Sequence, residues 1–80
     1  MFEYQISLVT MQDINDFVNI ATKYHKPLKL TDKENYSVNA SSIIGVMYSL
    51  EWNHLYLLSE EDVYSLFSKF IIHTRVKTTN

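Results

Sequence analysis

The chain contains no cysteine among its 80 residues, so neither disulfide bonds nor thiolate metal sites can hold the fold together. A single apolar core must supply the stability, close to the lower size at which one core suffices. The composition suits this task, because 46% of the residues are hydrophobic and 14% are aromatic, while Gly and Pro occur once each. Disordered chains combine low hydrophobicity with high net charge, and this chain has neither. We expect one folded domain over residues 1–80.

The charge balance argues against a nucleic-acid partner. The net charge is −2, and the one cluster of cations, Lys23, Lys26 and Lys29, stands beside Asp32 and Glu34. A basic footprint is therefore missing. No apolar stretch approaches the ~20 residues that cross a bilayer, and the first residues lack the pattern of a signal peptide. We expect a cytoplasmic protein that binds neither nucleic acid nor membranes.

Hydrophobic periodicity predicts a strand and a helix in the first part of the chain. Residues 2–8 alternate between apolar and polar, as in a half-buried strand. Residues 11–24 carry apolar side chains at helical spacing, after Thr10 and Asp13, which are spaced as in a capping box. Pro27 cannot continue this helix.

The middle of the chain predicts a hairpin followed by a short helix. Residues 28–31 and 36–40 alternate as strands on either side of a polar turn. Ser41 and Ser42 then offer hydroxyl groups for the N-cap of a helix over residues 42–50. Because five residues of this helix are apolar and a short helix buries only one side, some of them should remain exposed.

The last part predicts a strand, a helix and a polar tail. Residues 54–58 form the strand, and Ser59 and Asp62 are spaced as a second capping box before an apolar stripe over residues 63–71. Residues 73–80 read as a flexible tail. The order β-α-β-β-α-β-α predicts an α+β fold in which helices cover one face of a four-stranded antiparallel sheet.

Residues 37–50, Ser-Val-Asn-Ala-Ser-Ser-Ile-Ile-Gly-Val-Met-Tyr-Ser-Leu, resemble the HPr family, the histidine-containing phosphocarriers of the bacterial sugar phosphotransferase system. In that family a strand ending Val-Asn leads to a helix of the type Ser-Ile-Met-Gly-Val-Met-Ser-Leu. Residues 21–24, Ala-Thr-Lys-Tyr, also resemble the end of the family's first helix. The element order agrees over about the whole chain. The resemblance implies a single HPr-like domain, an open-faced β-sandwich.

The resemblance fails where the family carries its phosphoryl group. The family's histidine lies in a Gly-Ile-His-Ala-Arg-Pro segment at the start of the first helix, whereas residues 8–14 here contain no His, Arg or Pro. A phosphohistidine at a helix start needs free backbone N–H groups and a cationic side chain. Asp13 and Asp16 place carboxylates there instead, so we expect no phosphoryl group on this segment.

The resemblance also implies a docking surface within residues 39–50, formed by apolar side chains of the short helix. We expect the following residues to bind a partner: Ile43, Ile44, Met47 and Tyr48. Methionine suits such surfaces because it is flexible and polarizable. An apolar stripe at helical spacing can equally be core. Gly45 costs about 1 kcal/mol inside a helix relative to Ala, which indicates a close backbone approach or a docking surface.

Ser42 aligns with the serine that a dedicated kinase phosphorylates in Gram-positive members of the family. A phosphate at a helix N-terminus is favourable. The alternative is that Ser42 is only an N-cap, which contributes ~1 kcal/mol and already explains the residue.

Three other features of the sequence are candidate sites. His54 opens the expected fourth strand and is a conceivable substitute phosphoacceptor, although most lone histidines are hydrogen-bonded bystanders. Trp52, Tyr48 and Tyr56 can form an aromatic recognition surface or pack in the core. His25 and His73 stand alone, so we predict no metal site. No catalytic constellation and no cofactor motif stands out, and we expect no enzyme.

The leading hypothesis is an HPr-like adaptor or regulator that docks to proteins without carrying a phosphoryl group on histidine. Phosphotransferase-system enzymes or a transcriptional regulator are the implied partners. The alternatives are a divergent phosphocarrier using His54 and a structural or oligomerising module. The protein itself is expected to be a monomer or a weak homo-oligomer.

Overall fold

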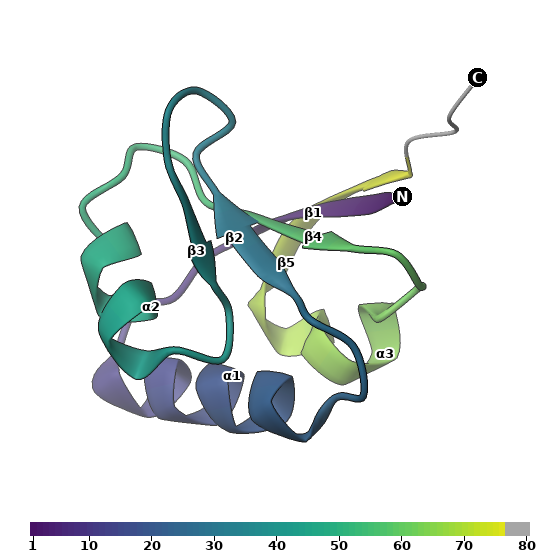
Figure 1. The fold of residues 1–80 in the computed structure, drawn as a ribbon, viewed down its shortest axis with the longest axis horizontal. Helices are drawn as coiled ribbons and strands as arrows, with labels where there is room; N and C mark the ends of the chain where they lie inside the picture. The colour runs from purple at the N-terminus through teal and green to yellow at the C-terminus, as the bar shows by residue number, and fades with distance from the viewer. Residues whose placement is uncertain (77–80) are drawn as a thin grey trace.

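The computed structural model describes the backbone of residues 1–76 and the side chains of residues 1–73. The elements follow in this order: β1 (Phe2–Ile6), α1 (Met11–Lys23), β2 (Lys29–Thr31), β3 (Ser37–Asn39), α2 (Ile43–Ser49), β4 (Tyr56–Ser59), α3 (Tyr64–Phe67), a 3-10 turn (Ser68–Phe70) and β5 (Ile71–Val76). The strands form one sheet in the order β3-β2-β4-β1-β5, with every neighbouring pair antiparallel. The helices lie together on one face of this sheet (Figure 1). The α+β class and the helix-covered antiparallel sheet are confirmed.

The expected four strands are wrong, because the sheet has five. Residues 73–76, expected in a flexible tail, belong to β5 and pair with β1; the rest of that tail, residues 77–80, lies outside the described residues. β4 occupies one edge of β1, and the N–H and C=O groups of the other edge need partners as well. Ile71 and Ile72 are β-branched and suit a strand. The chain therefore continues as β5, which pairs antiparallel with this other edge of β1.

The expected helix over residues 63–71 is also shorter than its apolar stripe. Val63, Phe67 and Phe70 are buried as the stripe requires, but only residues 64–67 are α-helical. A 3-10 turn then ends at Phe70 and leads directly into β5. The stripe spacing therefore marked these three buried residues correctly but was wrong for Leu66, which is exposed, while pairing with β1 decided the backbone conformation.

The second capping box is wrong as well. α3 begins after Val63 with no side-chain cap. Ser59 instead closes a turn, since its Oγ accepts from the Glu61 amide at 3.1 Å and donates to the Glu61 carbonyl at 2.6 Å. The Asp62 carboxylate accepts from the Tyr64 amide at 3.0 Å. Both residues form short turns because they favour local side-chain-to-backbone bonds.

The first capping box and the hairpin are confirmed. The Thr10 hydroxyl accepts from the Asp13 amide, and the Asp13 carboxylate accepts from the Thr10 amide. β2 and β3 pair antiparallel as a hairpin, with Leu30 opposite Val38. The core fills the space between α1, α3 and the sheet, and its aromatic centre is Phe17, whose ring lies 5.1 Å from Phe67.

α2 is fixed closely against the sheet. Its N-cap is Ser42, whose hydroxyl accepts from the Gly45 amide at 3.1 Å. A Cβ at Gly45 would lie 3.2 Å from the Val38 Cβ of β3, which is tighter than ordinary contact. Gly45 therefore permits the close backbone approach that the sequence indicated, and α2 buries Val46 and Ser49 behind it.

The open face of the sheet carries an ion pair whose carboxylate is buried. Glu3 is 1% exposed, and its carboxylate lies 2.8 Å from the Lys33 ammonium of the β2–β3 turn. Lys33 adopts a left-handed φ of 67°, and its ammonium also lies 5.0 Å from the centre of the Tyr56 ring. A non-glycine residue in this region carries strain, so the pair draws the turn toward the sheet at a conformational cost.

Replacing Lys33 with Met should lower the free energy of unfolding by roughly 1–3 kcal/mol, because a buried carboxylate loses a close cation while the aliphatic stem is kept. Urea denaturation at pH 7 measures this change. The matched control is Lys69→Met, which breaks the exposed pair with Asp16 at 2.9 Å and should cost less than about 1 kcal/mol. Equal losses in both variants would contradict the importance of the Glu3 pair.

Tyr4 connects β1 to the start of α3. Its buried hydroxyl donates to the Asp62 carboxylate at 2.8 Å and accepts from the Val63 amide at 3.0 Å. Burial, followed by the hydrogen bond to Asp62, raises the pKa of Tyr4 from 10.0 to about 12. The neutral phenol is thus the form that the fold stabilises.

The stability contributed by Tyr4 should be complete below pH 10 and should decline as the pH rises toward 12, because the unfolded chain ionises first. Tyr4→Phe should remove this part of the alkaline decline. At pH 7 it should cost roughly 1–3 kcal/mol, since the buried Val63 amide loses its acceptor. Urea denaturation across pH 7–12 tests both effects, with the exposed Tyr64→Phe as the control. An unchanged alkaline profile in Tyr4→Phe would refute the assignment.

Candidate functional site

The outer surface of α2 is apolar and uncharged. All four predicted partner-binding residues are exposed, with Ile44 at 78%: Ile43, Ile44, Met47 and Tyr48. No charged residue occurs between residues 41 and 50. Leu50, at the end of the helix, is exposed as well. The expected exposure is confirmed, and the function of this surface remains a prediction.

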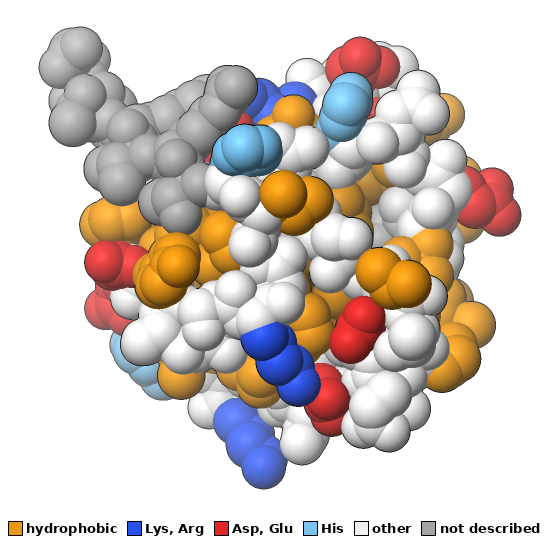
Figure 2. Space-filling view, turned by 180° about the vertical axis from the view of Figure 1, so that it is seen from behind, with side chains coloured by type: hydrophobic (Ala, Val, Ile, Leu, Met, Phe, Trp, Pro, Cys, Tyr) orange, Lys and Arg blue, Asp and Glu red, His pale blue; other side chains and the backbone are white. Residues whose placement is uncertain are grey.

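Packing explains why these side chains stay outside. α2 lies on β3 and α1, and its seven residues bury one side, at Val46 and Ser49. The Ser49 hydroxyl is satisfied by the Val46 carbonyl at 2.6 Å. In the view of Figure 2, hydrophobic side chains reach the surface among polar ones, including at the edge where α2 lies.

Two further exposed apolar residues precede and begin α1. Val9 is 80% exposed and Met11 is 54% exposed. Met11 was expected within the buried stripe of the helix, and this expectation is wrong because it lies before the first buried position, Ile14. The exposure of Val9 was not predicted. Val9 occupies a position that the alternation of residues 2–8 assigns to polar residues. An apolar residue at such a position was the signal that could have indicated exposed apolar surface.

A recess of about 210 Å³ lies between the end of β1 and the loop that joins α2 to β4. Its lining comes from residues 5–8, 49–50, 52–55 and 72. Leu8, Leu50, Trp52 and Ile72 supply apolar surface. The sequence did not predict this recess, because part of its lining comes from β5, a strand that the sequence did not predict.

Besides Ser49, whose hydroxyl donates to the Val46 carbonyl, four hydrogen-bonding side chains line the recess: Gln5, Ser7, Asn53 and His54. None of these four side chains forms a hydrogen bond with another residue that the structure describes. No Asp, Glu, Lys or Arg belongs to the lining. The recess therefore offers donors and acceptors that no described residue occupies.

His54 lies in the loop before β4 and does not open the strand, which begins at Tyr56. Its side chain is exposed, with its ring 6.3 Å from the Tyr56 ring. The expected proximity to the end of β1 is confirmed, because the Ile6 amide donates to the Leu55 carbonyl at 2.9 Å. His54 thus stands at the recess, with no cation in the lining to assist a phosphoryl group.

The aromatic surface considered from sequence is only partly assembled. The Trp52 ring lies 6.5 Å from the Tyr48 ring in an edge-on arrangement and 6.0 Å from the Tyr36 ring in a stack. Trp52 is half-buried against the core. Tyr56 lies beneath Lys33 on the open sheet face. Trp52 therefore contacts aromatic rings of α2 and of the β2–β3 turn. Tyr56 lies apart from them, next to the Lys33 ammonium.

Ser42 is exposed, and its hydroxyl is engaged as the N-cap. The capping role is confirmed by the bond to Gly45. Phosphorylation of this residue remains a prediction.

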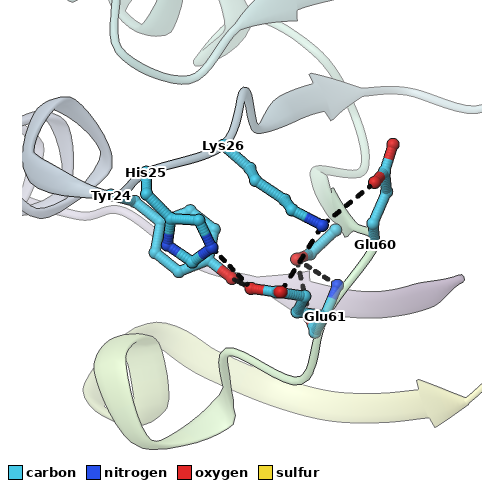
Figure 3. A network of polar contacts seen from close by, with 6 residues as sticks. Tyr24, His25, Lys26, Glu60 and Glu61 are labelled. Carbon is cyan, nitrogen blue, oxygen red and sulfur yellow. Dashed lines mark hydrogen bonds and ion pairs between the residues drawn. The ribbon is translucent and has the colours of Figure 1, made fainter.

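A polar network lies at the other end of α1 (Figure 3). The Tyr24 hydroxyl donates to Glu61, whose carboxylate also lies 3.1 Å from His25 and 3.4 Å from Lys26. Lys26 lies 3.5 Å from Glu60 as well. The hydrogen bond from Tyr24 lowers the pKa of Glu61 and raises that of Tyr24. These exposed contacts join the end of α1 to the turn before α3, and we assign them a structural role.

Among residues 1–76, no group of three or more His, Asp or Glu side chains is arranged to hold a metal ion. Within the same residues, no helix has the length and apolar character needed to cross a bilayer.

The chain matches no family model, no curated protein and no solved structure. Its function is therefore argued from its own residues and their geometry.

Proposed function

We propose that this protein is an HPr-like adaptor or regulator that docks to a partner protein through α2 and carries no phosphoryl group on histidine. The observation that carries this proposal is the exposed, uncharged outer surface of α2. Contiguous exposed apolar surface on a small domain marks interaction sites. Met47 adds the flexibility that docking surfaces exploit.

The HPr-like part of the proposal is supported by the order and pairing of the elements. From β1 to α3 the order is that of the family, and β4 lies antiparallel beside β1, as the resemblance implies. The segment from Val38 through Met47, which carries the resemblance, forms β3 and α2. β5 is a departure from the family pattern at the opposite edge of the sheet.

The start of α1 supports the loss of phosphoryl transfer. The Asp13 carboxylate accepts from the Val9 amide at 2.9 Å and from the Thr10 amide at 3.3 Å. The Thr10 hydroxyl accepts from the Asp13 amide at 3.1 Å. Three N–H groups at this helix start are thus occupied, and the group that accepts from the Val9 and Thr10 amides is itself negative. The proposed partners are phosphotransferase-system enzymes or a transcriptional regulator, which would recognise the α2 surface.

Immobilised protein should retain a partner from a lysate of bacteria that contain the phosphotransferase system. Ile44→Asp and Met47→Asp should each reduce recovery at least tenfold, because a charge in a desolvated contact costs more than ~1.4 kcal/mol. Quantitative mass spectrometry measures recovery. Leu66→Asp on α3 is the matched control, since Leu66 is an exposed apolar residue at 45%.

Equal recovery by the α2 variants and by the Leu66 control would refute α2 as the docking surface. If the retained partner is the protein itself, light scattering at several concentrations will show a mass that rises with concentration and falls in Ile44→Asp. That outcome would identify an oligomerising module in place of an adaptor.

A second candidate function is phosphoryl transfer through His54, favoured by its exposed position at the end of β1. We expect no transfer, because the lining of the recess supplies no cation. Incubation with phosphoenolpyruvate and the first enzyme of the system should leave the mass unchanged. An acid-labile gain of one phosphate that is lost in His54→Ala, and retained in the control His25→Ala, would instead establish a carrier.

A further inference from the structure

The charges of this chain are strongly segregated along the sequence. Residues 1–22 and 34–68 contain none of the seven Lys and Arg residues but eight of the nine acidic residues. The acidic residues in these segments are Glu3, Asp13, Asp16, Glu34, Glu51, Glu60, Glu61 and Asp62. The cations are confined to residues 23–33 and 69–77.

The recess and the α2 surface are built almost entirely from these cation-free segments. Residues 5–8 and 49–55 supply the recess, together with Ile72 of β5. Exposed Glu51 lies in the loop beside it. Lys69, the cation that approaches the first turns of α1, is paired with Asp16 at 2.9 Å. Of the acidic residues named above, Glu51 is the one in the loop that joins α2 to the recess, and it is exposed.

The α2 surface and the recess are continuous. Leu50 ends α2, is exposed on its surface, and also lines the recess. Trp52 lines the recess and contacts Tyr48 of α2 edge to face. A partner lying along α2 therefore reaches the mouth of the recess without crossing a charged or buried barrier.

The lining of the recess defines what can enter it. Leu8 and Trp52 offer apolar walls, while Ser7, Asn53 and His54 offer hydrogen-bonding groups. An aliphatic side chain would leave these polar groups without partners, and a charged one would meet no opposite charge. An aromatic side chain with a polar tip satisfies both kinds of wall, because its ring is apolar and its hydroxyl or indole N–H forms hydrogen bonds.

We propose that the partner presents a basic polypeptide segment that inserts a tyrosine or tryptophan side chain into this recess, with its Lys or Arg residues beside Glu51. The proposal rests on the docking function of α2 and specifies the chemistry of what docks there. The ring fills the space between Leu8 and Trp52, and its polar tip bonds to the Asn53 and His54 side chains. The basic neighbours are attracted by the exposed Glu51 carboxylate, which favours association at low ionic strength.

A phage-displayed library of random twelve-residue peptides, selected on the immobilised protein, tests the chemistry. Selected sequences should be enriched in Tyr or Trp with Lys or Arg within a few positions. Enrichment in acidic or purely aliphatic peptides would overturn the proposal, and so would the absence of any selection over the empty support. The affinity of a synthetic copy of the most enriched peptide should fall as salt is raised from 50 to 500 mM.

Nuclear magnetic resonance titration of the same synthetic peptide locates its site on the parent protein. The largest shifts should fall on the amides of Ser7 and His54 and on the Trp52 indole. Shifts confined to the open face of the sheet would overturn the assignment. Because this measurement needs no substitution, it stands even where a variant is poorly folded.

Three variants separate this inference from the docking proposal. Ser7→Trp fills the recess and should weaken the affinity for the synthetic peptide at least tenfold. Glu51→Lys should weaken this affinity severalfold and reduce its dependence on salt. Glu60→Lys, the control, should change neither the affinity nor its salt dependence. If Ile44→Asp abolishes recovery of the partner while Ser7→Trp does not, the docking function holds and the recess proposal fails. If the peptide binds but Ile44→Asp leaves partner recovery unchanged, the recess holds and docking through α2 fails.

Discussion

The pairing of β1 along both of its edges is the constraint on which the rest of the structure depends. β4 occupies one edge and β5 the other, so segments distant in the sequence are brought to the point where β1 ends. The Ile6 amide bonds to the Leu55 carbonyl at 2.9 Å, and the Ser7 amide bonds to the Phe70 carbonyl at 2.8 Å. These two bonds place the β1 end between the α2–β4 loop and the start of β5. The recess is the consequence, because its polar and apolar linings come from those three segments.

The outward face of α2 follows from how closely the helix approaches the sheet. Gly45 lets the helix backbone lie against Val38, and Val46 and Ser49 fill the space behind it. Rolling the helix to bury Ile44 would bring Val46 out and would leave the Ser49 hydroxyl without its present surroundings. A longer helix could hide its apolar residues against a second element, but seven residues have one buried side. The exposure is therefore built into the packing and is compatible with a stable fold.

The sequence predicted the local elements well and the long-range ones less well. Alternation and capping residues sufficed for β1, α1, the β2–β3 hairpin and the exposed surface of α2, because each depends on neighbours in the chain. The spacing of Phe67, Phe70 and Ile71 suited a helix, and only the open edge of β1 decided for a strand. The ion pair between the buried Glu3 carboxylate and Lys33 could not be predicted either, since the alternation of β1 assigned Glu3 to an exposed face. The recess could not be predicted for the same reason: its lining joins segments that only the sheet order brings together.

The same end of the fold is the basis on which we propose docking and not group transfer for this molecule. A phosphoryl group needs free N–H donors and nearby cations, but here the Val9 and Thr10 amides are bonded to Asp13, and Lys69 is bonded to Asp16. These contacts also stabilise the first turns of α1, so the residues that would repel a phosphate are the ones that hold the helix start in place. What that arrangement leaves accessible is apolar surface, with the exposed carboxylate of Glu51 beside it. Such a surface gains little from binding an anion and much from covering by a cationic, aromatic segment.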